Sequence, residues 1–173
     1  MRKGRVRGIA QSHRASTFDR AASRAGLAVC KGKNAVKAEH QAAISIHAEW
    51  GNTGSVDLDA HFVNAEPNSV RWDYGLGVSN GSIDLVFWIE PHPASSTREV
   101  KRLGRKVTWL KSKLRTSPFS ELSTMTDKTI ALGHNPYRWV HAGSIHIARN
   151  SREARELARA GVEFPCRYVR LPS

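Results

Sequence analysis

The chain has 173 residues, and its 27 lysines and arginines outnumber its 15 aspartates and glutamates, which leaves a formal charge of +12 at pH 7. This length suits one domain with a substantial core, and the 40% apolar and 24% charged fractions argue against a wholly disordered chain. The excess positive charge favours a polyanionic partner through counterion release, with nucleic acid as the first candidate. Ribosomal association or an acidic membrane surface would use the same charge.

The sequence has no segment typical of a membrane span or a secretory signal. No run approaches the ~18 apolar residues that a spanning helix needs, and no apolar segment follows the basic N-terminus. We therefore expect a soluble, cytoplasmic protein that does not enter a membrane. Cys30 and Cys166 lie far apart and show no C-x-x-C spacing, so we expect two buried free thiols.

The first part of the chain, residues 1–34, is rich in arginine, lysine, glycine, serine and alanine. We interpret it as a basic arm with one short helix in "STFDRAASRAGLAV", which Gly26 would end. A solvated terminus and a direct role on phosphate are both open. Residues 35–173 are expected to form a single α/β domain.

A helix is predicted over residues 34–51, because Asn34 can cap it and Gly51 can end it. Helical spacing would then place one carboxylate, Glu39, in an otherwise apolar row. The other members of that row are Val36, Ala43, Ile46 and Trp50. Glu39 is therefore expected to face inward.

Three antiparallel strands are predicted at about residues 55–64, 69–78 and 82–90. This stretch alternates polar and apolar residues, and turn signals separate its β-branched and aromatic segments. Proline cannot donate to a ladder, so Pro91 should end the third strand at Glu90. "GLGVSNG" is interpreted as hairpin glycine usage rather than a phosphate loop, because a strand follows it.

A strongly basic helix is predicted to follow. Ser96 and Glu99 form an S-x-x-E capping box, and an apolar face repeats at helical spacing: Val100, Leu103, Val107, Leu110 and Leu114. The other faces carry seven cations against the single acid Glu99: Arg98, Lys101, Arg102, Arg105, Lys106, Lys111 and Lys113.

The remainder is predicted as an irregular stretch at about 115–135, a strand in "YRWVHAGSIHIA", a capped helix ending at Gly161 and a closing strand. This succession of elements indicates an α/β sandwich, with a mixed sheet flanked by helices.

Asp73 and Glu90 are the candidate metal ligands, because a hairpin would bring the second and third strands side by side. Two adjacent carboxylates repel as anions, and the usual remedies are a raised pKa or a divalent cation. Magnesium prefers oxygen ligands, often one or two carboxylates with water and substrate phosphate. Such a site suits phosphodiester cleavage, because the metal lowers the pKa of water and neutralises charge at phosphorus.

A helix acid (Glu39), a strand acid (Asp73 in "RWDYGLG") and an apolar strand ending E-x-H (Glu90 to His92), followed by a helix, resemble the PD-(D/E)XK nuclease superfamily. The resemblance covers roughly residues 35–114 and implies a restriction-endonuclease-like fold. It implies that Asp73 and Glu90 bind Mg²⁺ or Mn²⁺, that Pro91 lends a carbonyl and that Glu39 supports the site.

His92 stands where the superfamily has a lysine that orients or activates water. The resemblance implies that His92 takes that place, assisted by a cation from the next helix: Lys101, Arg105 or Lys106. Cations of the same helix would hold the nucleic-acid backbone: Arg98, Arg102, Arg105, Lys111 and Lys113. The function implied is that of a metal-dependent nuclease on DNA or RNA.

Each candidate also has a purely structural interpretation. Asp73 can pair with Arg71 across strands, Glu90 can be a surface turn acid, Glu39 the edge of an apolar stripe and His92 an ordinary loop histidine. The basic helix can be a solvated face. The histidines form no H-E-x-x-H motif, which disfavours zinc. Two other functions therefore stay open: a non-catalytic nucleic-acid-binding protein, and a structural component of a nucleoprotein assembly.

Overall fold

A computed structural model describes residues 15–141 and 143–172 of the chain. Most of the predicted basic arm, residues 1–14, lies outside the described residues. The helix predicted within the arm is α1 (Thr17–Arg24), and Ser16 and Asp19 form a capping box at its start. Gly26, at φ +78°, follows its end. Phe18, Ala21 and Ala22 of α1 are buried in the main core.

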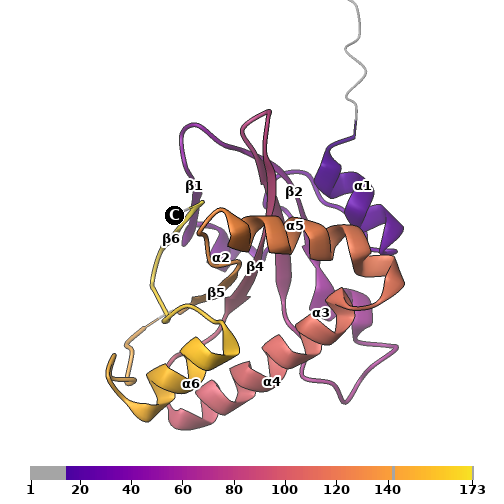
Figure 1. Cartoon of the computed structure of the whole chain (residues 1–173). Coiled ribbons are helices and arrows are strands. Elements are labelled where there is room, and N and C mark those ends of the chain that lie inside the picture. Colours follow the sequence, from indigo (N-terminus) through magenta and orange to yellow (C-terminus); the bar gives the residue numbers. More distant parts are fainter. Residues whose placement is uncertain (1–14, 142, 173) are drawn as a thin grey trace, which may run out of the picture.

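The centre of the fold is the mixed sheet that the sequence predicts. Its order is β2 (Gly51–Asp57), β3 (Tyr74–Ser79), β4 (Asp84–Pro91) and β5 (Tyr137–Val140). The first two pairs are antiparallel, whereas β4 and β5 are parallel. Figure 1 shows helices packed along this sheet. The predicted α/β architecture is therefore confirmed.

The predicted strand boundaries need three corrections. The first strand ends at Asp57, because the Asp57 side chain accepts a hydrogen bond from the backbone N–H of Ala60 and caps α3 (Leu58–Phe62). The second strand begins only at Tyr74. The third strand includes Pro91, which pairs with Val140. The backbone N–H of His92, the next residue, donates to the Val140 carbonyl.

The helix predicted over residues 34–51 is wrong. That segment forms α2 (Ala38–Gln41) and β1 (Ile44–Ile46). Strand β1 pairs in parallel with the closing strand, β6 (Val169–Leu171), in a separate two-stranded sheet. Of the row read as a helix face, Val36 is buried, and Ala43, Ile46 and Trp50 are partly buried, in the core on one face of the central sheet. This packing overrides local helix propensity.

Helix α4 (Thr97–Leu114) has the predicted apolar face buried. Ser96 is its N-cap but makes no side-chain cap bond, and the Glu99 carboxylate pairs with His92. The predicted capping box is therefore not formed.

The stretch predicted as irregular, 115–135, contains η1 (Ser117–Phe119) and α5 (Ser120–Ala131). Thr126 and Thr129 face the sheet from α5, where Thr126 accepts a bond from Trp88 and Thr129 bonds to the backbone of Val86. Because these buried positions are polar, the apolar residues of α5 do not repeat at helical spacing, and the helix was not predicted. Helix α6 (Arg152–Ala160) begins after Ser151 and ends at Gly161, as predicted.

Two cores lie on the two faces of the sheet. The larger contains the buried faces of α1, α4 and α5, with Trp72, Trp88 and Trp139 fully buried. The smaller lies between the opposite face and the β1–β6 pair. Both cysteines are free and only partly buried. Among residues 15–141 and 143–172, no helix has the length and apolar character to cross a membrane.

Two glycines of β3, Gly75 and Gly77, let side chains of the main core pack directly against the backbone. A Cβ at Gly77 would lie 2.4 Å from Cγ of Phe18. We expect Gly77→Ala to cost about 1–3 kcal/mol of unfolding free energy through overpacking, measured by urea denaturation. Gly104→Ala, where a Cβ meets nothing within 4 Å in the middle of α4, should stabilise by up to about 1 kcal/mol. Equal stability of the two variants would contradict this packing.

Candidate active site

One edge of the central sheet gathers three carboxylates. Strands β2 and β4 run in the same direction, with β3 antiparallel between them. The end of β2 (Asp57), the residue before β3 (Asp73) and the end of β4 (Glu90) therefore share that edge. The backbone N–H of Asp73 donates to Oε2 of Glu90 over 3.2 Å.

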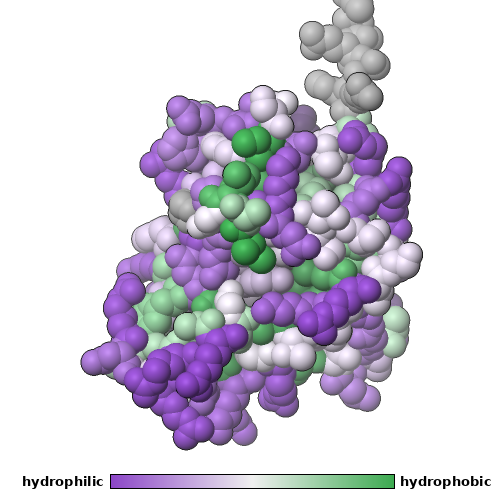
Figure 2. Space-filling model, in the orientation of Figure 1, coloured by the Kyte–Doolittle hydropathy of each residue, from purple (hydrophilic) through white to green (hydrophobic). Residues whose placement is uncertain are grey.

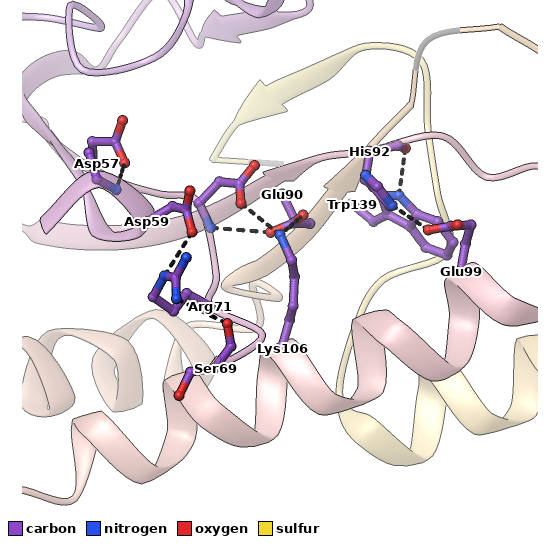
Figure 3. A network of polar contacts seen from close by, with 11 residues as sticks. Asp57, Asp59, Ser69, Arg71, Glu90, His92, Glu99, Lys106 and Trp139 are labelled. Atoms are coloured by element: carbon purple, nitrogen blue, oxygen red, sulfur yellow. Dashed lines mark hydrogen bonds and ion pairs between the residues drawn. The ribbon is translucent and has the colours of Figure 1, made fainter. Parts of the chain in front are cut away.

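Lys106 of α4 joins two of these acids. Its Nζ donates to Oδ1 of Asp73 over 2.7 Å and to Oε1 of Glu90 over 2.5 Å. The Glu90 side chain is 0% exposed, that of Lys106 is 8% and that of Asp73 is 24%. Figure 3 shows Lys106 extending from α4 to Glu90. The surface-turn interpretation of Glu90 is therefore wrong.

The electrostatics of this triad follow from its burial. Burial raises the pKa of Glu90 well above its ordinary value, and the charge of Asp73 adds to the effect. Burial alone would lower the pKa of Lys106, but the charges of Glu90 and Asp73 outweigh it and raise that pKa. Lys106 therefore stays a cation throughout the neutral range.

Asp57 is a residue that sequence reasoning missed. Its pKa is raised, first by burial and further by the charges of Asp59 and Asp73. The carboxylate of Asp57 therefore interacts electrostatically with Asp73 of the site. The sequence signal that could have found it is that of a helix N-cap: Asp57 directly precedes the short helix α3.

Arg71 pairs with Asp59, with Nε 2.9 Å from Oδ1. Its guanidinium also donates to the carbonyls of Glu66 and Ser69. The pairing of Arg71 with Asp73, considered from the sequence, is not the pairing observed. The Asp73 carboxylate is therefore left to Lys106 (Figure 3).

His92 is held apart from the triad. Its ring pairs with Glu99 of α4, its N–H donates to the Val140 carbonyl, and its own carbonyl accepts from Trp139 Nε1 over 2.8 Å. Figure 3 shows the His92–Glu99 pair apart from Lys106, nearer the start of α4. Of the cations considered from the sequence, Lys106 contacts Asp73 and Glu90, whereas His92 contacts Glu99.

Glu39 does not join the site. It lies on the four-residue helix α2 with its side chain 69% exposed, and its ion contact is with His40 at 3.9 Å. The expectation that Glu39 faces inward is wrong, because the long helix that would have turned it inward does not form.

The other predicted cations divide into two groups. Arg98, Lys101, Arg102 and Arg105 are exposed on α4. Lys111 donates to the carbonyl of Ala160, and Lys113 pairs with Glu66. Arg102 lies one helical turn before Lys106, so the two project on neighbouring parts of one helix face.

A cavity of about 570 Å³ lies away from the triad, between α4, α5 and the start of β5. Lys111 and Tyr137 line it. Burial lowers the pKa of Lys111, with Arg115 adding to the effect, and raises the pKa of Tyr137 to about 12. Asp73, Glu90 and Lys106 do not line this cavity, so it is separate from the candidate site.

Asp73 and Glu90 are the two carboxylates at the sheet edge that could hold a hard cation. Within the described ranges, no group of three or more histidine, cysteine, aspartate or glutamate side chains is arranged to hold a metal. The ammonium of Lys106 contacts both Asp73 and Glu90, so the two carboxylates converge on one cationic group. Magnesium often takes only one or two protein carboxylates.

Comparison with protein-family models, with curated proteins and with solved structures gave no match. The resemblance to the PD-(D/E)XK superfamily therefore rests on this chain's own residues.

Removing Lys106 should destabilise the protein in a pH-dependent way. Lys106→Met leaves Glu90 buried beside Asp73 without a cation, which we expect to cost about 3–5 kcal/mol near neutral pH. A carboxyl whose folded pKa is raised loses stability as pH rises from about 4.3, the unfolded value, through the folded pKa. The variant raises that pKa further, so its deficit should be larger at pH 8 than at pH 5.

Thermal unfolding across this pH range checks the prediction. Lys128→Met, at an exposed position of α5, is the matched control and should change little at either pH. A deficit of Lys106→Met that is the same at pH 5 and pH 8 would show that Glu90 does not depend on Lys106.

Proposed function

We propose that this protein is a metal-dependent nuclease that hydrolyses phosphodiester bonds of DNA or RNA. The observation that carries the proposal is the contact of one lysine, Lys106, with both Asp73 and Glu90 at the edge of the sheet. Two acids and a lysine are the functional residues that the superfamily resemblance implies. Here the lysine comes from the following helix.

The proposed roles follow from the chemistry of each group. Asp73 and Glu90 supply the carboxylate oxygens that would hold Mg²⁺ or Mn²⁺, and the superfamily resemblance adds the Pro91 carbonyl as a ligand. Such an ion would lower the pKa of water and neutralise charge on the phosphate. Lys106, whose raised pKa keeps it protonated, then donates to the attacking water or to a phosphate oxygen.

The surface around the site suits a polyanion. Arg98, Lys101, Arg102 and Arg105 are exposed along α4, and Figure 2 shows hydrophilic residues along the outer side of α4 and α6. Contacts with phosphate position a nucleic acid without reading its sequence. Arg102, one turn from Lys106, is placed to hold a phosphate near the reacting one.

A non-catalytic nucleic-acid-binding protein is the second candidate. A specific observation favours it: Lys106 already neutralises both carboxylates in a buried, hydrogen-bonded arrangement. Such a network is complete without metal and can serve folding specificity. The basic surface of α4 would then act alone.

Cleavage of plasmid DNA and of single-stranded RNA, with magnesium, manganese or chelator, tests the proposal. We expect metal-dependent cleavage that falls by about 10²–10⁴-fold in Asp73→Asn, Glu90→Gln and Lys106→Met. Glu121→Gln and Lys128→Met, on α5, are the controls and should retain activity. Circular dichroism checks that every variant is folded.

Two results would count against a nuclease centred here. Metal-dependent cleavage that survives all three substitutions would place the activity elsewhere. Nucleic-acid binding that persists in chelator, with no cleavage of either substrate, would favour the non-catalytic candidate.

His92 offers a separate test of how the site is arranged. Because its ring contacts Glu99 and not the triad, we expect His92→Gln to reduce the cleavage rate by less than about ten-fold, below the range of a direct acid or base. Glu99→Gln should have a similar small effect. A fall in cleavage rate of 100-fold or more in His92→Gln, in a variant that unfolds at the wild-type temperature, would show that His92 takes part directly in catalysis.

A further inference from the structure

The cavity of about 570 Å³ lies apart from the candidate active site, and nothing in the proposed hydrolysis uses it. Residues of α4, of α5, of the start of β5 and the glycine that ends α6 line it. Figure 1 shows α5 in front of the sheet, with α4 and α6 below it. Binding sites for small molecules usually measure between about 300 and 1,000 Å³. The cavity is therefore large enough for a small organic ligand.

Two cations of α4, Lys111 and Arg115, line this cavity. They are four residues apart, so they project from the same face of the helix. Burial lowers the pKa of Lys111, and the charge of Arg115 lowers it further, because the two cations repel each other. The Lys111 ammonium donates to the carbonyl of Ala160 over 2.7 Å and lies 5.0 Å from the centre of the Tyr137 ring. These contacts hold Lys111 at the cavity without neutralising its charge.

The acid of the cavity does not neutralise this pair. Asp127 of α5 lines the cavity, where its charge adds to burial in raising the pKa of Tyr137 to about 12. In the part of the chain that the structure describes, neither Lys111 nor Arg115 makes an ion pair. An anion placed between two neighbouring cations removes their repulsion and accepts charge-assisted hydrogen bonds from both. The cavity therefore favours an anionic ligand.

The lining also has an apolar part. Leu114 of α4, Pro136 and the Tyr137 ring contribute to it, together with Ile130 of α5. The Ile130 side chain is 51% exposed, so a ligand that covers it would remove apolar surface from water. An inorganic anion would leave this surface uncovered. The lining therefore suits a ligand that carries both an anionic group and an organic group.

We propose that this cavity binds a phosphate monoester of a small organic molecule, with the phosphate at Lys111 and Arg115 and the organic group against Leu114 and Ile130. A phosphate monoester carries a charge of about −1.5 to −2 at pH 7, which matches two cations better than the single charge of a carboxylate. A guanidinium can donate two parallel bonds to phosphate, and an ammonium adds a second point charge. Nucleoside 5′-monophosphates belong to this class. The inference does not depend on hydrolysis at Asp73 and Glu90.

Isothermal titration calorimetry of the full chain tests the inference. The ligands titrated are adenosine 5′-monophosphate, phenyl phosphate, adenosine and inorganic phosphate. Chelator is present, so that no divalent metal bridges a phosphate to the carboxylates of the candidate active site. We expect at least one monoester to bind about ten-fold or more tightly than adenosine and inorganic phosphate, because each of these lacks one of the two groups that the cavity recognises.

Variants of the two cations test where the monoester binds. Arg115→Gln and Lys111→Gln should each weaken its binding by about 10- to 100-fold, because each removes charge-assisted hydrogen bonds. Arg115 is exposed, so its variant should unfold at the wild-type temperature even if the lost bond to Ala160 destabilises Lys111→Gln. Lys101→Gln is the matched control, because it removes an exposed cation of α4 that does not line the cavity. Its affinity should equal that of the wild type.

Chemical labelling locates the ligand independently. Lysines are acylated with an N-hydroxysuccinimide ester and followed by mass spectrometry, with and without the monoester. We expect the monoester to protect Lys111 and to leave Lys101 reactive. Protection of Lys101 without protection of Lys111 would place the ligand on the outer surface of α4 and overturn the inference.

Three calorimetric results would also overturn it. They are wild-type affinity in Arg115→Gln, inorganic phosphate or adenosine that binds as tightly as both monoesters, and no binding of either monoester at millimolar concentration. Each of these results leaves the nuclease proposal standing, because that proposal is tested by cleavage in variants of Asp73, Glu90 and Lys106. Loss of cleavage in those variants, in turn, leaves monoester binding unchanged.

Discussion

A carboxylate with no exposed surface, Glu90, lies beside a second carboxylate, and the ammonium of Lys106 makes that arrangement stable. An isolated buried charge is costly unless it is paired and hydrogen-bonded. The relative placement of β3, β4 and α4 is therefore constrained at one point. Any small shift of α4 along its axis would separate Lys106 from Glu90 and leave the acid unpaired.

The position of Lys106 depends on apolar packing elsewhere along α4. Leu103, Val107 and Leu110 are buried against the main core, which holds the helix at a fixed rotation over the sheet. Because Lys106 directly precedes Val107, its long side chain reaches the sheet edge while its neighbours fill the core. The same triad thus contributes to stability and supplies the groups that the proposed hydrolysis needs.

Much of the local structure could be predicted because it depends on residues close together in the chain. Ser16 and Ser151 cap their helices, Gly161 ends α6, and the apolar face of α4 is buried. Asp73 and Glu90 could be proposed together, because a hairpin places β3 beside β4. The strand β1 was missed, since it pairs with β6 at the far end of the chain.

By itself, the sequence determined the basic character of the protein, the mixed α/β architecture and the two acids at the edge of the sheet. Only the tertiary structure decided which cation completes that site: Lys106 reaches Glu90, while Lys101 and Arg105 remain exposed and His92 turns to Glu99. It also turned Glu39 outward. The physical reason is that periodicity reports which residues share a face of one element, whereas burial and ion pairing depend on how distant elements pack.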